Sequence, residues 1–173
     1  MGIGGLGHLA LQFAKSQGFT TIALDSRQAG RDLATDVPDA LRPDLVLDST
    51  TTDTQERIFD FTKGEGIAAA VVCTDSIEAN ASTLRLLRIN GVMVPLGLPP
   101  ERWQFDADVL VFRQLIIRGS YVASRRETEE MMDVVALHGV RSHLTVVEFG
   151  DVPGIVDRYQ EKEFSGRLVV KII

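Results

Sequence analysis

The glycine residues at the start of the chain have the spacing of a known phosphate-binding loop. Gly2, Gly4 and Gly7 fit the pattern G-x-G-x-x-G. In this pattern the first glycine allows a tight turn, the second lets the backbone approach a pyrophosphate, and the third lets a helix pack closely on a strand. The following helix would present free N–H groups and its positive dipole end to the anion. The pattern predicts a dinucleotide site, with an ordinary glycine turn as the simpler alternative.

An acidic residue stands where such a site needs one. Asp25 follows an expected strand at 20–24 and comes 18 residues after Gly7, and the fingerprint places an acid about 20 residues on. Its carboxylate would accept hydrogen bonds from the ribose hydroxyls and would repel the 2′-phosphate of NADP. Because Arg27 could instead accept that phosphate, we expect NAD as the cofactor and keep NADP as the less favoured alternative.

Short β-rich runs alternate with helical patterns, which is typical of βαβ units and a parallel sheet. Strands are expected at 20–24, 45–47, 68–73, 92–96 and 115–118, and helices at 6–17, 54–62, 76–87 and 106–112, with a turn at Asn90-Gly91. An apolar stripe of Leu6, Leu9, Ala10 and Phe13 should bury one face of the first helix. The run at 68–73 is apolar enough for a strand covered on both faces. We predict an α/β fold, a Rossmann-type doubly wound parallel sheet.

The first strand of that fold is missing from the pattern, because the glycine loop begins at residue 2 and the strand before it is central in the order 3-2-1-4-5-6. A strand has about five or six residues, and its burial could contribute on the order of 10 kcal/mol. Total domain stability is only about 5–15 kcal/mol. We therefore expect either a fragment of a longer enzyme or remaining strands that close the gap.

The pattern changes after residue 122. We expect a NAD-binding domain at 1–122 and a C-terminal α+β segment at 123–173. The segment should contain a helix at 127–138, a strand at 144–147, a second helix and a final strand at 166–173. In the second helix the apolar positions are Val152, Ile155, Val156 and Tyr159, with Pro153 in the first turn, where proline is tolerated.

Composition excludes several classes of protein. The 173 residues are 45% hydrophobic and 24% charged, which is average for a globular chain and not for a disordered or coiled-coil one. The net charge of −6 disfavours a nucleic-acid partner, and no apolar run is long enough for a membrane helix. Cys73 is the lone cysteine, so we expect no disulfide and a cytoplasmic location.

A spaced set of short motifs beyond the glycine loop resembles the zinc-dependent medium-chain alcohol dehydrogenases. In the family's order, the motifs are 2–10 with 12–15, Cys73-Thr74, 84–87 before Asn90-Gly91, 96–99, 117–122 and 166–169. The resemblance covers essentially the whole chain and implies hydride transfer between an alcohol or aldehyde and nicotinamide. Asp75 departs from the family, which usually has glycine there, and its charge could weaken cofactor binding.

The resemblance also implies roles for particular residues. Backbone groups of Leu96 and Ser120 would bind the carboxamide, and Arg167 would face the pyrophosphate, with a solvated strand arginine as an equal alternative. The full set of expected cofactor-binding residues is Gly2, Gly4, Gly5, Leu6, Gly7, Asp25, Cys73, Thr74, Leu96, Gly97, Leu98, Ser120, Tyr121, Val122 and Arg167.

The family's zinc ligands and proton relay lie in an N-terminal catalytic domain. One Cys and three scattered His do not have zinc-ligand spacing, so we expect no catalytic residue and no bound zinc in this chain, which alone should be inactive. The leading hypothesis is the NAD-binding portion of an alcohol dehydrogenase-like oxidoreductase acting on a small alcohol or aldehyde, and a homo-oligomer is possible. The alternative is an inactive NAD-binding remnant or regulatory module.

Overall fold

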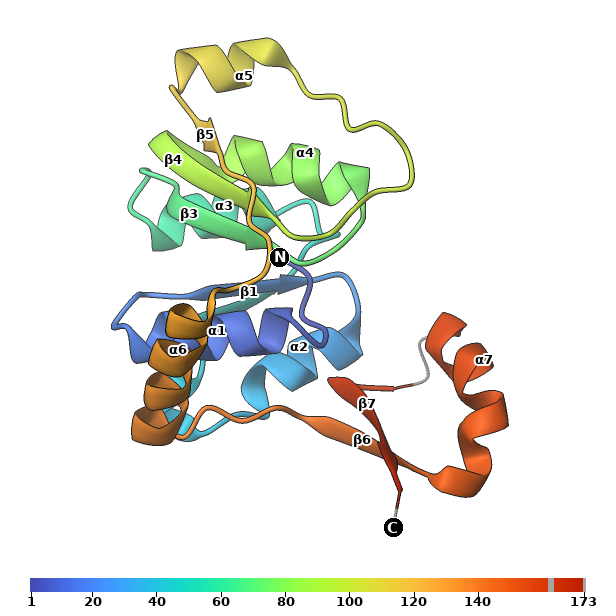
Figure 1. Ribbon diagram of the computed structural model, residues 1–173. Coiled ribbons are helices and arrows are strands. Elements are labelled where there is room, and N and C mark those ends of the chain that lie inside the picture. The colour runs from blue at the N-terminus through green and yellow to red at the C-terminus, as the bar shows by residue number, and fades with distance from the viewer. Residues whose placement is uncertain (162–163, 173) are drawn as a thin grey trace.

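The computed structural model describes residues 1–161 and 164–172, and its first part alternates helices and parallel strands (Figure 1). The elements in order are α1 (Gly7–Ser16), β1 (Ile22–Asp25), α2 (Gln28–Thr35), η1 (Asp39–Leu41), β2 (Leu45–Asp48), α3 (Thr54–Phe61), β3 (Ile67–Val72), α4 (Ile77–Leu86), β4 (Leu87–Pro95), α5 (Ala107–Phe112) and β5 (Ile116–Ile117). The C-terminal segment contains α6 (Arg125–His138), β6 (Leu144–Glu148), η2 (Phe149–Gly154), α7 (Ile155–Gln160) and β7 (Arg167–Lys171).

Within the described residues the strands form three parallel sheets. β1 pairs with β2, β3 pairs with β4 and β4 with β5, and β6 pairs with β7. The register of β1 and β2 sets Asp25 opposite Asp48, so both acids lie at the carboxyl edge. β1 and β3 are not neighbours in any of these sheets.

Helices cover both faces of the β1-β2 sheet. Because successive side chains of a strand point to opposite faces, Ala23 packs with Leu33 of α2 on one face. On the other face Leu24 packs with Ile58 of α3 and Leu86 of α4. A separate cluster joins α4 to the second sheet through Val72, Leu84, Leu87, Met93 and Leu115. The predicted Rossmann-type, doubly wound α/β class is confirmed.

The face that α1 buries is not the predicted apolar stripe. Leu6 is 48% exposed and the other three stripe residues, Leu9, Ala10 and Phe13, are only half-buried, whereas the fully buried residues of α1 are Gly7, His8 and Gln12. The C-terminal segment provides hydrogen-bond partners for this polar face. Nε2 of His8 accepts from the backbone N–H of His143 (3.1 Å), and Oε1 of Gln12 accepts from the N–H of Arg141 (2.9 Å). The prediction was wrong because these partners come from more than 125 residues away along the chain.

Two strand predictions also need correction. β3 is not covered on both faces, because Ala69 is exposed and Val71 is 39% exposed while Val72 is buried. The Asn90-Gly91 pair is not a turn between elements, because α4 leads directly into β4, which contains the pair. Asn90 has a φ of 60°, a conformation that asparagine tolerates better than most residues.

The other predicted elements agree with the structure within a few residues, but α2 was not predicted. Ser124 and Glu127 form a capping box that starts α6, a sequence signal that our prediction of 127–138 did not use. Pro153 lies in η2 rather than in the first turn of α7. β7 alternates exposed and half-buried residues, and Ile173 of the predicted final strand lies outside the described residues.

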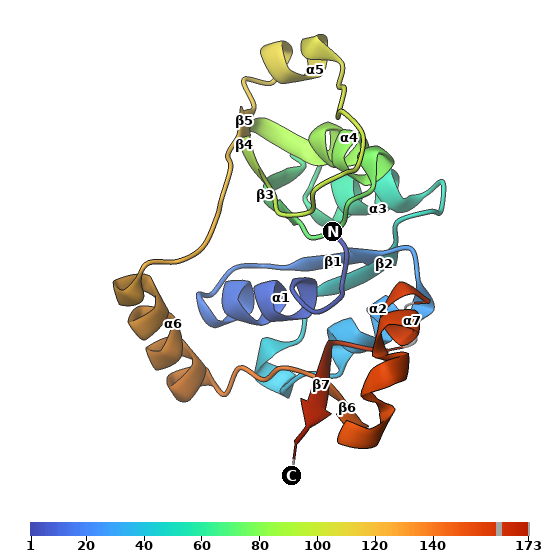
Figure 2. The ribbon, with the colours of Figure 1, turned by 45° about the vertical axis from the view of Figure 1, so that its right-hand side comes forward.

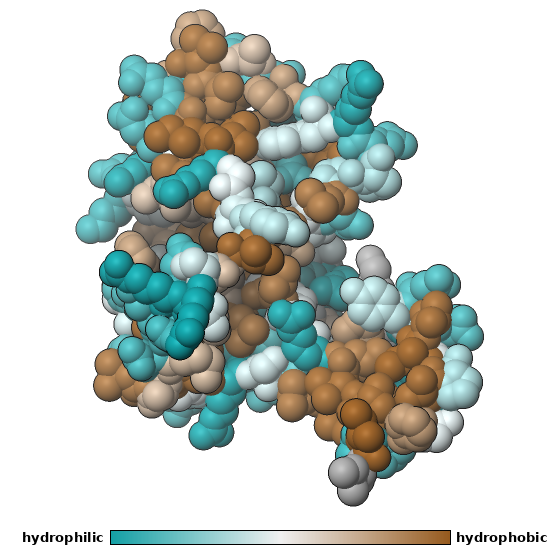
Figure 3. Space-filling model, viewed as in Figure 1, coloured by the Kyte–Doolittle hydropathy of each residue, from teal (hydrophilic) through white to brown (hydrophobic). Residues whose placement is uncertain are grey.

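The C-terminal segment carries much exposed apolar surface. Side chains coloured as hydrophobic gather over β6, β7 and α7 in the lower right of Figure 3. They include Leu144, Val146, Phe149 and Val156, each more than half exposed. Only Val140 and Val147 are buried apolar residues among the described residues 139–172. Polar contacts with α1, together with the contact between His143 and Asp36, join this segment to the first part of the chain. No helix in the described residues is both long and apolar enough to cross a membrane.

The buried His8 should make stability depend on pH. Nδ1–H of His8 donates to the Gly4 carbonyl (2.8 Å), so Nε2 accepts from His143 only when the ring is neutral. Burial, and after it the charges of Arg167 and His143, lower the pKa of His8, while the hydrogen bond to Gly4 opposes this. The unfolded chain, with a histidine pKa of about 6.5, then binds the proton more readily. The stability that neutral His8 contributes is therefore present above pH ~6.5 and is lost as the pH falls below that value.

Urea unfolding at pH 7.5, 6.5 and 5.5 tests this expectation. His8→Gln should lower stability at every pH and remove most of the loss between pH 6.5 and 5.5. The control is His138→Gln, which changes an exposed histidine on α6. This variant should still lose stability between pH 6.5 and 5.5. An unchanged pH dependence in His8→Gln would contradict the assignment of the effect to His8.

Candidate cofactor site

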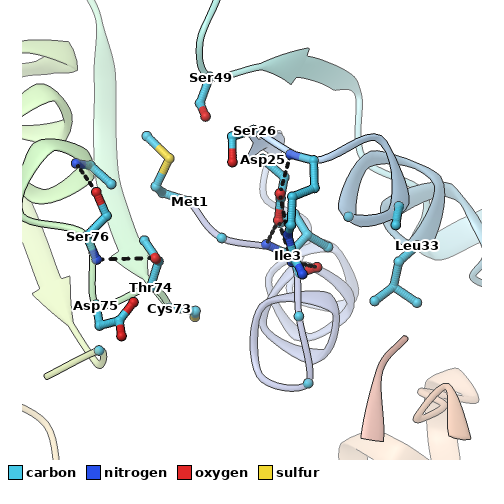
Figure 4. A pocket seen from close by; sticks show the side chains of 18 of the residues that line it. Met1, Ile3, Asp25, Ser26, Leu33, Ser49, Cys73, Thr74, Asp75 and Ser76 are labelled. Carbon is cyan, nitrogen blue, oxygen red and sulfur yellow. Dashed lines mark hydrogen bonds and ion pairs between the residues drawn. The ribbon is translucent and has the colours of Figure 1, made fainter. Parts of the chain in front are cut away.

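A pocket of about 810 Å³ lies at the carboxyl ends of β1, β2 and β3, beside the glycine loop (Figure 4). Its lining includes the loop at 1–5, the end of β1 at 25–27, Ser49-Thr50 after β2, and 73–76 after β3. In open α/β sheets, ligands bind in the crevice outside the carboxyl ends of the strands, where the strand order reverses. The volume is within the usual range for small-molecule sites.

The glycine loop has the geometry that its spacing predicts. Gly2 has a φ of +82°, and a Cβ there would lie 3.1 Å from Cβ of Thr74, so a larger residue would be strained and crowded. Gly4 instead faces open space, with nothing within 4 Å of a Cβ built on it. The hydrogen bonds of the described residues give the N–H groups of Gly4 and Gly5 no protein acceptor. Those donors, with the N-terminus of α1, form a cradle for an anion.

Asp25 lies at the site but is already engaged by protein groups. Its carboxylate accepts from the N–H of Ile3 (2.6 Å) and from the N–H and Nε of Arg27 (2.8 and 3.2 Å). The side chain is only 3% exposed, and Figure 4 shows it pointing toward Ile3. Asp25 therefore anchors the glycine loop to the end of β1. The sequence did not predict this role, and contact with a ribose remains a prediction.

The ends of β3 and β4 form the opposite wall. Cys73 and Thr74 line the pocket as expected, and Gly97 packs so closely on Thr74 that a side chain there would collide with the Thr74 carbonyl. Burial raises the pKa of the Cys73 thiol, which keeps it neutral and poorly nucleophilic. Asp75 also lines the pocket and does not have the positive φ that would require glycine. Its carboxylate thus adds negative charge without backbone strain.

The C-terminal segment completes the pocket. Tyr159 and Phe164 stack at a ring distance of 5.3 Å, and both line it. A Cβ on Gly5 would lie 3.1 Å from Cδ of Arg167, so the arginine side chain passes directly beside the loop. Contact of Arg167 with a pyrophosphate remains a prediction. The two aromatic residues were missed because only the folded chain brings them to this site.

Several predicted residues do not line the pocket. Five of them are close to lining residues in the sequence but are not lining residues themselves: Leu6 and Gly7 at the start of α1, Leu96 and Leu98 on either side of Gly97, and Arg167 after Gly166. Ser120, Tyr121 and Val122 lie in an exposed stretch between β5 and α6, and Tyr121 is 94% exposed. Their role toward nicotinamide remains a prediction. Across residues 1–161 and 164–172, no three His, Cys, Asp or Glu side chains converge as metal ligands do.

Comparison with known proteins identifies the class. The zinc-binding dehydrogenase family matches residues 5–136, and the chain belongs to this family. It is 31% identical over 171 residues to an alcohol dehydrogenase of Rhizobium meliloti (strain 1021), covering 99% of this chain and 48% of that protein. For an alcohol dehydrogenase of Geobacillus stearothermophilus the identity is 32%, over 99% of this chain and 49% of the relative. The chain spans about half the length of these curated relatives.

Solved structures agree with this assignment. The alcohol dehydrogenase of Aeropyrum pernix superposes with a TM-score of 0.82 at 28% identity, over 96% of this chain and 47% of that one. The acetophenone reductase of Geotrichum candidum, solved in complex with NAD, also gives a TM-score of 0.82 at 26% identity, over 99% of this chain and 47% of that one. The chain is therefore part of an alcohol dehydrogenase-like oxidoreductase family.

Proposed function

We propose that this chain is the NAD-binding portion of an oxidoreductase that transfers a hydride between an alcohol or aldehyde and nicotinamide. The observation that carries the proposal is the glycine loop, which is open at Gly4, leads into the N-terminus of α1, and has the side chain of Arg167 beside Gly5. NAD fits this site because, among the described residues, the N–H groups of Gly4 and Gly5 have no protein acceptor and the cationic side chain of Arg167 lies beside Gly5, as binding of a pyrophosphate requires.

Each wall of the pocket has a part in binding. The loop and Arg167 hold the pyrophosphate, and the end of β1 with Ser26 and Asp25 lies on the side where the adenosine ribose would bind. Thr74 and Gly97, at the ends of β3 and β4, border the other end, where nicotinamide would bind. NAD supplies the carbon that accepts the hydride. The chain's residues orient it, and the stacked rings of Tyr159 and Phe164 border the pocket on the side of the C-terminal segment.

We further propose that NAD is preferred over NADP. Asp25 places a carboxylate at the end of β1 where a 2′-phosphate would approach, and like charges in a pocket repel. Arg27 partly neutralises this carboxylate through its guanidinium, so the preference should be moderate rather than absolute. Arg27→Ala should widen the preference for NAD over NADP, because the 2′-phosphate of NADP then loses the nearby cation.

Isothermal titration of the folded chain with NAD tests the proposed site. Arg167→Ala should weaken binding about 10-fold or more, because a hydrogen bond to a charged group contributes about 1.5–3 kcal/mol. Lys171→Ala removes a cation from the same strand, where it faces Glu148, and should have little effect. Equal affinities of these two variants would remove Arg167 from the site. Failure of the folded chain to bind either dinucleotide at millimolar concentration would overturn the proposed function.

A further inference from the structure

The buried histidine of α1 connects the glycine loop to the C-terminal segment. His8 is only 1% exposed, and both nitrogens of its ring make hydrogen bonds. Nδ1–H donates to the Gly4 carbonyl of the loop (2.8 Å), and Nε2 accepts from the backbone N–H of His143 (3.1 Å). His143 directly precedes β6. One imidazole ring therefore bridges the phosphate cradle and the start of the C-terminal sheet, which Figure 2 shows beside α2 and near the loop end of α1.

The connection continues through the backbone to Arg167. The carbonyl of His143 accepts from the N–H of Arg167 (2.8 Å), and Leu144, the next residue, is the register partner of Arg167 in the β6-β7 pair. The side chain of Arg167 then returns to the loop, because its Cδ would lie 3.1 Å from a Cβ built on Gly5. His8, His143 and Arg167 therefore form a closed path that starts and ends at the glycine loop.

The backbones along this path are in close contact. A Cβ on Gly166 would collide with the His143 carbonyl, and a Cβ on Gly5 would lie 2.9 Å from the Gly166 carbonyl. Close-packed groups transmit a displacement because they have no free space to absorb it. A shift of His143 away from α1 would therefore also move residues 166–167 relative to the loop.

A second polar contact holds the same segment without reaching the loop. The side-chain amide of Gln12 accepts from the N–H of Arg141 (2.9 Å) and donates to the Arg141 carbonyl (2.8 Å). Gln12 thus fixes the segment to the middle of α1, whereas His8 fixes it to the glycine loop itself. The position of His143 relative to Gly4 is the part of the arrangement that depends on the imidazole ring.

Arg167 has reason to depend on such a constraint. Its side chain is long and exposed, and a side chain of this kind loses rotamer freedom when it binds a ligand. Holding the backbone from which it starts reduces that loss before the ligand arrives, which is the general effect of preorganisation on affinity.

We infer that His8 is a positioning residue, which holds Arg167 beside the glycine loop so that the arginine can contact the pyrophosphate of a bound dinucleotide. The inference rests on the proposed function, and it assigns to a side chain of α1 part of the affinity that Arg167 contributes. The ring must be neutral in this role, because the N–H of His143 requires an acceptor at Nε2. Burial lowers the pKa of His8, so the ring is neutral at pH 7.5.

Two substitutions separate the two hydrogen bonds of His8. His8→Asn keeps an amide N–H near the place of Nδ1 and can donate to Gly4, but it is too short to accept from His143. His8→Gln is one methylene longer, and its oxygen can accept from His143. Titration calorimetry at pH 7.5 should show NAD binding about 5–10-fold weaker in His8→Asn and within about 2-fold of the unmodified chain in His8→Gln. The opposite order would assign the ring to the loop alone and overturn the inference.

A double-mutant cycle shows whether the effect passes through Arg167. In a chain with Arg167→Ala, adding His8→Asn should weaken NAD binding by less than about 2-fold, because residues that act through one interaction are not additive. The control is Lys15→Met, which removes an ion pair with Asp44 from the same helix. It should leave NAD affinity unchanged with or without Arg167. Full additivity of His8→Asn and Arg167→Ala would overturn the inference.

Amide hydrogen exchange without NAD gives an independent readout. In His8→Asn the N–H groups of His143 and Arg167 should exchange faster relative to that of Ile58, a buried residue of α3, and in His8→Gln they should stay protected. Unchanged exchange at both residues, or normal NAD affinity in His8→Asn, would overturn the inference and leave the proposed function standing. Failure of the unmodified chain to bind NAD would overturn the proposed function, and this inference with it.

Discussion

The Gly4→Val substitution should weaken NAD binding at least about 100-fold, which corresponds to about 2.7 kcal/mol, and should leave the free energy of unfolding nearly unchanged. Gly4 lines the pocket, and nothing lies within 4 Å of a Cβ built on it. The valine side chain would therefore project into the space of the pyrophosphate without displacing protein atoms. It would also hold the anion away from the N–H groups of the loop.

Two other glycines make the test specific. Gly150→Val places the same side chain at a position with equally open surroundings, in η2 outside the pocket lining, and should bind NAD normally. A Cβ on Gly5 would lie 2.9 Å from the Gly166 carbonyl, so Gly5→Val should destabilise the contact with β7 as well as reduce affinity. Titration calorimetry and urea unfolding separate these outcomes. Normal NAD affinity in Gly4→Val would show that the pyrophosphate does not bind at this loop.

The features that were predicted well from the sequence depend on residues that are close to one another along the chain. The glycine spacing implies a turn followed by a helix, and the structure shows a positive φ at Gly2 and a helix from Gly7. Asp25 ends a strand because a short apolar run precedes it. Each of these depends on fewer than ten consecutive residues.

The features that sequence missed depend on distant partners. An apolar stripe on α1 was a reasonable prediction for an isolated helix, but His143 and Arg141 provide hydrogen bonds that favour burial of His8 and Gln12. The same contacts help place β7 and Arg167 beside Gly5. The aromatic wall at Tyr159 follows from this docking and has no local signal. The polar face of α1 therefore links the C-terminal segment to the cofactor loop.

Asp25 should have two separable roles, and two substitutions distinguish them. Asp25→Ala leaves the N–H of Ile3 without its acceptor, and an unsatisfied buried donor costs about 1–3 kcal/mol. We expect urea unfolding to show this decrease in the free energy of unfolding. Both dinucleotides should also bind more weakly, because the glycine loop loses its anchor. Asp25→Asn keeps an oxygen that can accept from Ile3, so most of the stability and of the NAD affinity should remain.

The negative charge of Asp25, in contrast, should determine the preference between NAD and NADP. Asp25→Asn removes the repulsion of a 2′-phosphate and leaves Arg27 free of its carboxylate partner, so the preference for NAD over NADP should narrow by about 10-fold, or about 1.4 kcal/mol. Asp32→Asn, at an exposed acid on the neighbouring helix α2, is the control and should change neither stability nor preference. If Asp25→Asn binds NAD and NADP in the same ratio as the unmodified chain, Asp25 serves only to anchor the glycine loop. The discrimination would then belong to other residues at the end of β1, of which Ser26 and Arg27 both line the pocket.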